Sequence, residues 1–149
     1  MTGTTPAAWN DPVKGTELTK AQISQGADVV YAAAGGTGVG VLQAAADADI
    51  LSIGVDANQN YMHPGQVLTS MLKRVDLAVY NAFSEGESLT TGFNIMGLAE
   101  DGVGYALDEY NASLVNAQMI STLETEKAKI VNGQIKVHDY MSDNNCPVK

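Results

Sequence analysis

Apolar and β-branched residues gather in three short runs along the first half of the chain, at 28–34 (DVVYAAA), 50–56 (ILSIGVD) and 66–72 (QVLTSML). Such continuous apolar runs are typical of strands covered on both faces in a parallel sheet. Before the first run, Asp11 and Pro12 fit the N-cap and first residue of a helix over 12–25. The alternation of strands and helices predicts an α/β fold, with three α/β/α layers around an open, mainly parallel sheet.

The second half of the chain continues this pattern less regularly. A stripe of apolar residues at helical spacing predicts a helix that Gly86 ends; its members are Val75, Ala78, Val79, Ala82 and Phe83. A strand is predicted over 93–98 (FNIMGL), and a short last strand over 134–139 (QIKVHD). Between them, Asn111 is predicted to cap a long helix that ends at Gly133. The inward positions of this helix are Val115, Met119, Leu123 and Ile130.

Composition limits the class of protein. A chain of 149 residues, 45% of them hydrophobic, can bury one core, and no linker interrupts it, so residues 1–149 are expected to form a single α/β lobe. Seventeen acidic against eight basic residues give a formal net charge of −9, which repels nucleic acid and anionic lipid headgroups. The single cysteine excludes an intrachain disulfide. The first residues show no basic start with an apolar core, so no signal peptide is expected in this chain.

A glycine turn follows the first apolar run. Gly36, Gly38 and Gly40 give G-x-G-x-G, with Val41 where a dinucleotide motif has its last glycine and where a P-loop has lysine. Both phosphate motifs therefore fail. The remaining pattern is a glycine turn at a strand end, which either lets a ligand approach the backbone closely or only makes a tight turn into a helix.

Three further side chains stand at candidate positions. Asp56 ends the second run beside the glycine turn, where it can accept hydrogen bonds from a vicinal diol or cap the following loop. Lys73 closes the third run and can donate to a ligand, neutralise Asp56 or be solvated surface. Trp9 is the only tryptophan and can stack on a flat ligand or lie in the core or an interface.

Catalytic patterns are absent from the sequence. His63 and His138 have no second ligand at metal spacing, the cysteine has no evident partner base, and no serine lies in G-x-S-x-G. The carboxylates at 100, 101, 108 and 109 fall in a glycine-containing segment that we expect to be a solvated loop. We therefore expect no enzyme activity, metal or cofactor, and the lack of catalytic groups is compatible with a binding protein, which needs none.

Four blocks together, at 9–45 (WNDPVKG to VLQAA), 53–59 (IGVDANQ), 64–83 (PGQVLTS to VYNAF) and 100–111 (EDGVGYALDEYN), resemble the second half of the basic membrane protein family. These are substrate-binding lipoproteins of ABC transporters, of the purine nucleoside receptor type. The resemblance implies one lobe, with its crossover segments, of a type I periplasmic-binding-protein fold, whose first lobe is absent from this chain.

The resemblance also implies roles for individual residues and partners. Trp9 is expected to stack on the purine, Gly35 or Gly36 to approach the ligand by its backbone, and Asp56 and Lys73 to hold the ribose. The implied partners are a purine nucleoside, the missing first lobe or a second copy, and an ABC permease for the full-length protein, in the periplasm or cell envelope. Two alternatives stay open, namely a nucleotide-utilising α/β enzyme subunit and a non-binding, oligomeric half-domain.

Overall fold

The computed structural model describes residues 5–147, which form two compact units. The first unit ends at Asn116, and the second begins at Ala117. Each unit is described by itself. The candidate ligand residues all belong to the first unit, which also contains the sheet.

The sheet of the first unit has four strands in the order β1-β2-β3-β4. Their bounds are β1 Val29–Tyr31, β2 Leu51–Asp56, β3 Val67–Lys73 and β4 Val103–Tyr105. The first three are parallel neighbours, and β4 pairs antiparallel with β3. The three apolar runs are therefore strands as predicted, and the mainly parallel α/β fold is confirmed. The run at 28–34 forms a strand only over its first half.

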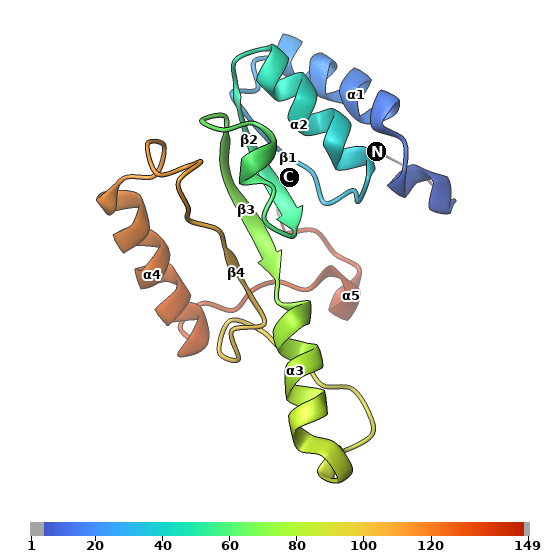
Figure 1. Ribbon diagram of the computed structural model, residues 1–149, viewed down its shortest axis with the longest axis vertical. Coiled ribbons are helices and arrows are strands. Elements are labelled where there is room, and N and C mark those ends of the chain that lie inside the picture. Colours follow the sequence, from blue (N-terminus) through green and yellow to red (C-terminus); the bar gives the residue numbers. More distant parts are fainter. Residues whose placement is uncertain (1–4, 148–149) are drawn as a thin grey trace. The chain divides into compact units, whose positions relative to one another are not determined.

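Two helices, α1 (Pro12–Ser24) and α2 (Thr37–Asp47), lie side by side on one side of β1 and β2 (Figure 1). The predicted N-cap is confirmed, because the Asp11 carboxylate accepts a hydrogen bond from the Lys14 amide at 2.9 Å. Glycine brings the helices together. A Cβ at Gly40 would collide with the Pro12 carbonyl, so only glycine allows this approach of the two backbones.

The core of the first unit consists mainly of small and β-branched side chains, together with Leu42 of α2. Val30 of β1 packs against Val41 and Ala45 of α2, with Ala32 and Ile50 partly buried beside them. Alanine and valine fill the narrow space between helix and strand without large rings. The sheet and α2 thus make a thin but closely packed layer that fixes the ends of β1 and β2.

A polar network fixes the loop that follows β2. Ser70 of β3 is fully buried; its hydroxyl donates to Asn60 Oδ1 at 2.8 Å and accepts from the Gln59 amide at 2.9 Å. Asn58 and Asn60 in turn donate to one carboxylate oxygen of Asp108, at 2.7 and 3.1 Å. These hydrogen bonds depress the pKa of Asp108, the largest cause being the bond from Asn58. Asp108 therefore links two loops by hydrogen bonds. The expectation of a solvated carboxylate at this position is wrong.

Asn111 also belongs to this network, and its prediction as a helix cap is wrong. Its buried amide donates to the carbonyls of Leu68 and Ala106, at 2.9 and 3.0 Å, and its carbonyl oxygen accepts from the Asp108 amide. The side chain thereby ties the segment after β4 to β3. The long helix starts later than predicted, at Ala117, because Asn111 satisfies loop and strand groups instead of helical amides.

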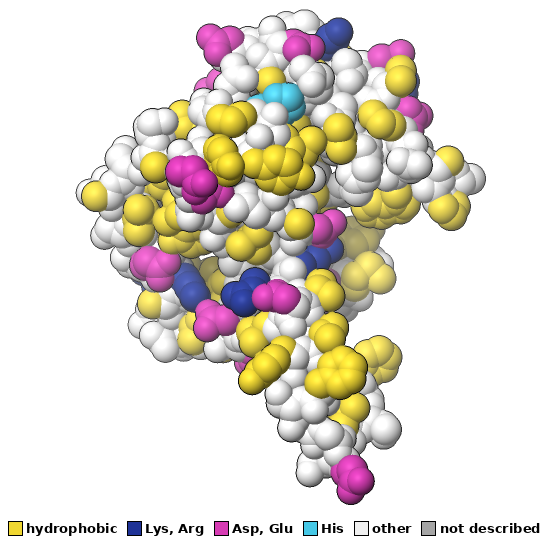
Figure 2. Space-filling view, viewed as in Figure 1, with side chains coloured by type: hydrophobic (Ala, Val, Ile, Leu, Met, Phe, Trp, Pro, Cys, Tyr) yellow, Lys and Arg dark blue, Asp and Glu magenta, His cyan; other side chains and the backbone are white. Residues whose placement is uncertain are grey.

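Helix α3 (Val75–Glu85) follows β3 and ends at Gly86, as predicted, but buries none of its residues. Figure 1 shows it extending away from the sheet, and its apolar side chains are visible on the projecting arm in Figure 2. The exposed members of the stripe are Val75, Val79, Tyr80 and Phe83. The pattern thus predicted the helix but not its surroundings.

Two predicted strands are not formed. Residues 93–98 have no regular structure, and the edge of β3 is occupied instead by β4, five residues further on. Phe93 and Ile95 are exposed, so the apolar character of this run does not lead to burial. In the second unit, α4 (Ala117–Val131) and the short α5 (Tyr140–Asp143) flank residues 134–139, which are also irregular. Both segments lack a neighbouring strand with which to pair.

Candidate functional site

Three polar side chains stand where the parallel strands end. Tyr31 is the last residue of β1, Asp56 of β2 and Lys73 of β3. Because carboxyl ends of parallel strands share one edge, these residues lie along the edge where α/β proteins bind ligands. Lys73 Nζ forms an ion pair with Asp56 Oδ1 at 2.7 Å, with both side chains about half exposed. The hydrogen bond to Asp56 is the main cause of a raised Lys73 pKa, so this amine stays charged at neutral pH.

The backbone of Asp56 is held in an uncommon conformation. Its φ is 69°, and the Ala57 amide bonds to the Val55 carbonyl at 2.9 Å, which closes a tight three-residue turn. The Val55 amide donates to the side chain of Gln59 at 2.9 Å. A non-glycine residue at positive φ costs free energy and persists where its surroundings hold it in place. The turn directs the Asp56 carboxylate toward Lys73.

Trp9 lies at the same edge, at the end of the short 3-10 helix η1 (Pro6–Trp9). Its side chain is 60% exposed, so it is outside the core. The buried Thr37 hydroxyl holds the segment by donating to the Ala8 carbonyl at 2.7 Å and accepting from the Asp11 amide at 2.8 Å. Trp9 is therefore anchored by its backbone while its ring remains accessible.

The glycine turn lies directly against this tryptophan. Gly35 has a φ of 54°, and a Cβ there would lie 3.0 Å from the Trp9 carbonyl oxygen and 3.7 Å from its ring. A Cβ at Gly36 would lie 2.8 Å from the side-chain oxygen of Asn10. The amides of residues 37–39 donate to the carbonyls of residues 34–36, so these three N–H groups are engaged within the turn. Both glycines allow the Trp9 segment to approach the start of α2.

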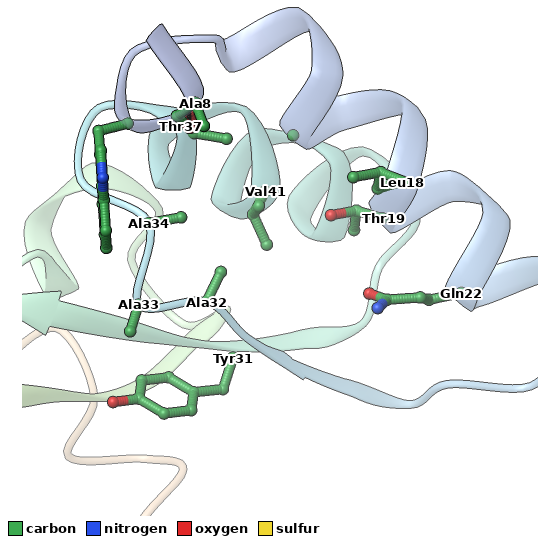
Figure 3. A pocket seen from close by; sticks show the side chains of 12 residues that line it. Ala8, Leu18, Thr19, Gln22, Tyr31, Ala32, Ala33, Ala34, Thr37 and Val41 are labelled. Carbon is green, nitrogen blue, oxygen red and sulfur yellow. Dashed lines mark hydrogen bonds between the residues drawn. The ribbon is translucent and has the colours of Figure 1, made fainter. Parts of the chain in front are cut away.

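A hollow of about 310 Å³ opens beside Trp9, between α1 and the end of β1 (Figure 3). Its lining includes Trp9 and Tyr31 but neither Asp56 nor Lys73. Tyr31 belongs to the lining of the hollow and is also an electrostatic neighbour of Lys73, whose pKa is raised chiefly by the hydrogen bond to Asp56. The structure thus brings Trp9, Gly35 and Gly36 together in one group and Asp56 and Lys73 in another, with Tyr31 between them. Sequence reasoning missed Tyr31, although its place at a strand end is the signal that singled out Asp56.

The described part of the chain contains neither a candidate metal site nor a candidate membrane span. Residues 5–147 contain no group of three His, Cys, Asp or Glu side chains placed to hold a metal ion. Within that same range, no helix has both the length and the apolar character needed to cross a bilayer.

Sequence comparison finds relatives among bacterial and archaeal proteins. The chain is 37% identical over 127 residues to basic membrane protein D of Borreliella burgdorferi, covering 80% of this chain and 37% of that protein. It is 33% identical over 145 residues to the CD4+ T-cell-stimulating antigen of Listeria monocytogenes, covering 83% and 39% respectively. An uncharacterised lipoprotein of Pyrococcus furiosus is 40% identical over 91 residues, covering 56% of this chain and 23% of that protein. The chain thus spans well under half the length of these relatives.

Solved structures give the same picture. An ABC transporter solute-binding protein of Aeropyrum pernix superposes with a TM-score of 0.76 at 27% identity, covering 87% of this chain and 45% of that one. A transcriptional activator of the comK gene from Bacillus halodurans shares the fold, with a TM-score of 0.75 at 24% identity, covering 89% and 46% respectively. The family model for PnrA-like ABC transporter substrate-binding proteins matches residues 5–140. The chain therefore belongs to the Bmp family of PnrA-like ABC transporter substrate-binding proteins, a family of binding proteins and not of enzymes.

Proposed function

We propose that this chain is one lobe of a purine nucleoside receptor, and that its sheet edge binds the nucleoside. The observation that carries the proposal is the placement of an accessible aromatic ring, Trp9, on the same edge as the Asp56 and Lys73 ion pair. A nucleoside has a flat apolar base joined to a polar diol. The two groups of side chains match these two halves.

The chemistry of each group supports this assignment. A base stacked on an indole ring gains about 1 to 3 kcal/mol, largely independent of base identity. The carboxylate of Asp56 has lone pairs for both hydroxyls of a ribose, and Lys73, which is paired with it at 2.7 Å, can donate to a ribose oxygen. Gly35 and Gly36 have no side chain to displace the Trp9 segment, so they allow this ring to lie beside the end of β1. Tyr31 lies between the two groups and is an additional candidate for contact with the sugar.

One lobe leaves this edge open to water. Open water weakens each polar contact, and binding sites for small molecules usually enclose most of the ligand. We propose that a second lobe closes over the edge, and that the closed protein delivers nucleoside to an ABC permease at the cell envelope. Nucleoside binding to the present chain alone is then expected to be weak, in the millimolar range or worse, near −4 kcal/mol.

Fluorescence of Trp9 tests the proposal, because this ring is the only tryptophan of the chain. Adenosine should quench its emission saturably, and 2′,3′-dideoxyadenosine should require a markedly higher concentration, since an ionised acceptor loses its partners. Asp56→Asn should abolish the difference between the two ligands. Asp49→Asn is the matched control, because Asp49 also has a positive φ, 56°, but lies after α2, away from the site.

The outcomes separate the alternatives. Equal saturation by both nucleosides would mean that Asp56 does not contact the ribose. Quenching by NAD but by neither nucleoside would favour a nucleotide-utilising protein. No saturable quenching at tens of millimolar nucleoside would overturn the proposed site on this chain.

A further inference from the structure

The turn that carries Asp56 is held on both of its sides. On one side, the Gln59 side-chain oxygen accepts a hydrogen bond from the Val55 amide at 2.9 Å. On the other side, the Asn58 side-chain amide donates to Asp108 Oδ2 at 2.7 Å, although Asp108 lies 50 residues later in the sequence. A single residue separates Asp56 from Asn58. A change in the Asp56 backbone therefore strains one or both of these hydrogen bonds.

Asp108 is itself fixed to the sheet. Its backbone amide donates to Asn111 Oδ1 at 2.9 Å, and the buried Asn111 side chain donates to the carbonyls of Leu68 and Ala106. The Ala106 amide bonds to the Ser70 carbonyl at 3.0 Å, so the chain continues to pair with β3 beyond the end of β4. The carboxylate of Asp108 thus has a fixed position relative to β3.

Three donors share the Asp108 carboxylate. Its Oδ2 accepts from the side-chain amides of Asn58 and Asn60, at 2.7 and 3.1 Å, and its Oδ1 accepts from the Tyr110 amide at 2.8 Å. Asn60 is fully buried, so water does not replace this acceptor if it is lost. A neutral amide at position 108 would offer one oxygen for three donors, whereas an ionised carboxylate satisfies all of them.

The conformation of Asp56 makes its direction sensitive to the hydrogen bond at Asn58. Its φ of 69° is unfavourable for a residue with a Cβ and persists only while the surrounding structure holds it. When Asn58 is released, the turn is free to relax to a negative φ. The Asp56 carboxylate then leaves its place 2.7 Å from Lys73 Nζ. A hydrogen bond at Asp108 can therefore act on the ion pair without touching it.

We propose that Asp108 is a positioning residue for the sheet edge where Asp56 and Lys73 lie. By holding Asn58 and Asn60, it sets the turn that presents Asp56 to Lys73. Its own side chain does not contact the ligand. That this edge binds a nucleoside rests on the proposed function, whereas the link from Asp108 to the ion pair does not. The competing explanation is that Asp108 only adds to the general stability of the first unit.

Nuclear magnetic resonance on the chain as it exists separates these explanations without a ligand. Asp108→Asn should speed hydrogen exchange of the Val55 amide by about tenfold or more, because the loop that protects this amide opens locally. The Ser52 amide near the start of β2 is bonded to the residue before β3 and should keep its exchange rate. The pKa of Lys73 should fall toward its usual 10.5, because Asp56 no longer lies against the amine.

Two variants distinguish the position of Asp108 from its charge. Glu109→Gln removes one negative charge from the next residue, which is exposed, and should change neither the Val55 exchange rate nor the Lys73 pKa measurably. The double variant Asn58→Asp with Asp108→Asn exchanges the donor and the acceptor of the 2.7 Å hydrogen bond and keeps the net charge. This double variant should recover most of the protection of Val55 that Asp108→Asn loses.

Three results would overturn the proposal. The first is an unchanged Val55 exchange rate or an unchanged Lys73 pKa in Asp108→Asn. The second is equal acceleration at Val55 and Ser52, because Asp108 would then only stabilise the unit as a whole. The third is the same response in Glu109→Gln, or no recovery in the double variant, because the hydrogen bond to Asn58 would then not be the cause. Absence of Trp9 quenching by adenosine would count against the proposed function alone.

Discussion

Helices α1 and α3 of the first unit show opposite relations between sequence pattern and burial. Along α1 the apolar residues form no clear stripe, yet Gly15 and Thr19 are buried against α2. Along α3 the stripe is regular, yet every residue is at least partly exposed. Small residues of α1 form its contact with α2, whereas the large apolar residues of α3 are exposed to solvent. An apolar stripe therefore indicates a face that can be covered, and close glycines indicate a face that is covered.

The difference has an energetic side. Burial of apolar surface stabilises the fold only where another element supplies the cover. In the contact between α1 and α2 the two backbones approach each other closely at Gly40 and Pro12. The stability of this contact therefore depends on how closely the two helix surfaces fit together. The stripe of α3 contributes little to the stability of the first unit, and its substitution should be tolerated.

The largest expected effect contrasts one side chain from each region. Leu42 of α2 is 2% exposed, whereas Phe83 of α3 is 82% exposed. Leu42→Ala should lower the free energy of unfolding by about 2 to 5 kcal/mol, since it leaves a cavity. Phe83→Ala should change it by less than about 0.5 kcal/mol. Urea denaturation followed by circular dichroism gives both values. A loss with Phe83→Ala as large as with Leu42→Ala would show that α3 is covered in solution.

The shape of the contact between α1 and α2 predicts a smaller effect. Gly40→Ala adds a methyl group against the Pro12 carbonyl, and overpacking of this kind costs about 1 to 3 kcal/mol. Gly104→Ala is the control, since a Cβ there meets nothing within 4 Å. The urea midpoint should fall for the first variant and stay near the wild type for the second. Equal midpoints would mean that the two helices separate easily and that their packing is loose.

The smallest effect concerns the first turn of α3. Arg74 donates to Asp76 at 3.0 and 3.1 Å, and these bonds lower the Asp76 pKa below its usual 3.8. A carboxylate with a depressed folded pKa stabilises the fold above its unfolded pKa, and this contribution is lost as the pH falls through the folded pKa. Amides at the start of α3 should thus exchange faster at about pH 3 than at pH 5, after correction for intrinsic rates.

The same experiment has an internal reference and a variant. Helix α2 has no acidic residue in its first turn, so its amides should show no such acid-induced opening. Asp76→Asn should make the exchange of α3 equal at both pH values. A pH effect that persists in this variant would place the titrating group elsewhere.

Sequence pattern predicted the elements whose residues have local causes. The cap at Asp11, the helix end at Gly86 and the three parallel strands all follow from short-range chemistry, and all are confirmed. The segment 93–98 has strand composition but no strand, because pairing needs a free neighbouring edge and β4 occupies that of β3. Asn111 fits a helix cap in sequence, but its partners at Leu68 and Ala106 are set by the tertiary fold.

The candidate site was predictable to a similar extent. Strand ends can be read from sequence, so Asp56 and Lys73 were placed correctly at one edge, and their direct ion pair was one of the roles considered. The exposure of Trp9 could not be read, because it depends on how Thr37 ties the preceding backbone. The hollow beside β1 has no sequence signal either, since it arises from the position of α1 over an open strand edge.

The loop after β2 has a consequence for the entropy of binding. The Gln59 side-chain oxygen accepts a hydrogen bond from the Val55 amide, and the Gln59 backbone amide donates one to the buried Ser70 hydroxyl. The turn that carries Asp56 is therefore ordered before any ligand binds. Ordering a flexible backbone costs about 1 to 2 kcal/mol per residue, and a loop that is already ordered avoids this loss. At the site we propose, a residue that does not touch the ligand, such as Ser70, is therefore expected to influence affinity through preorganisation, and loosening it should slow association as well as weaken the complex.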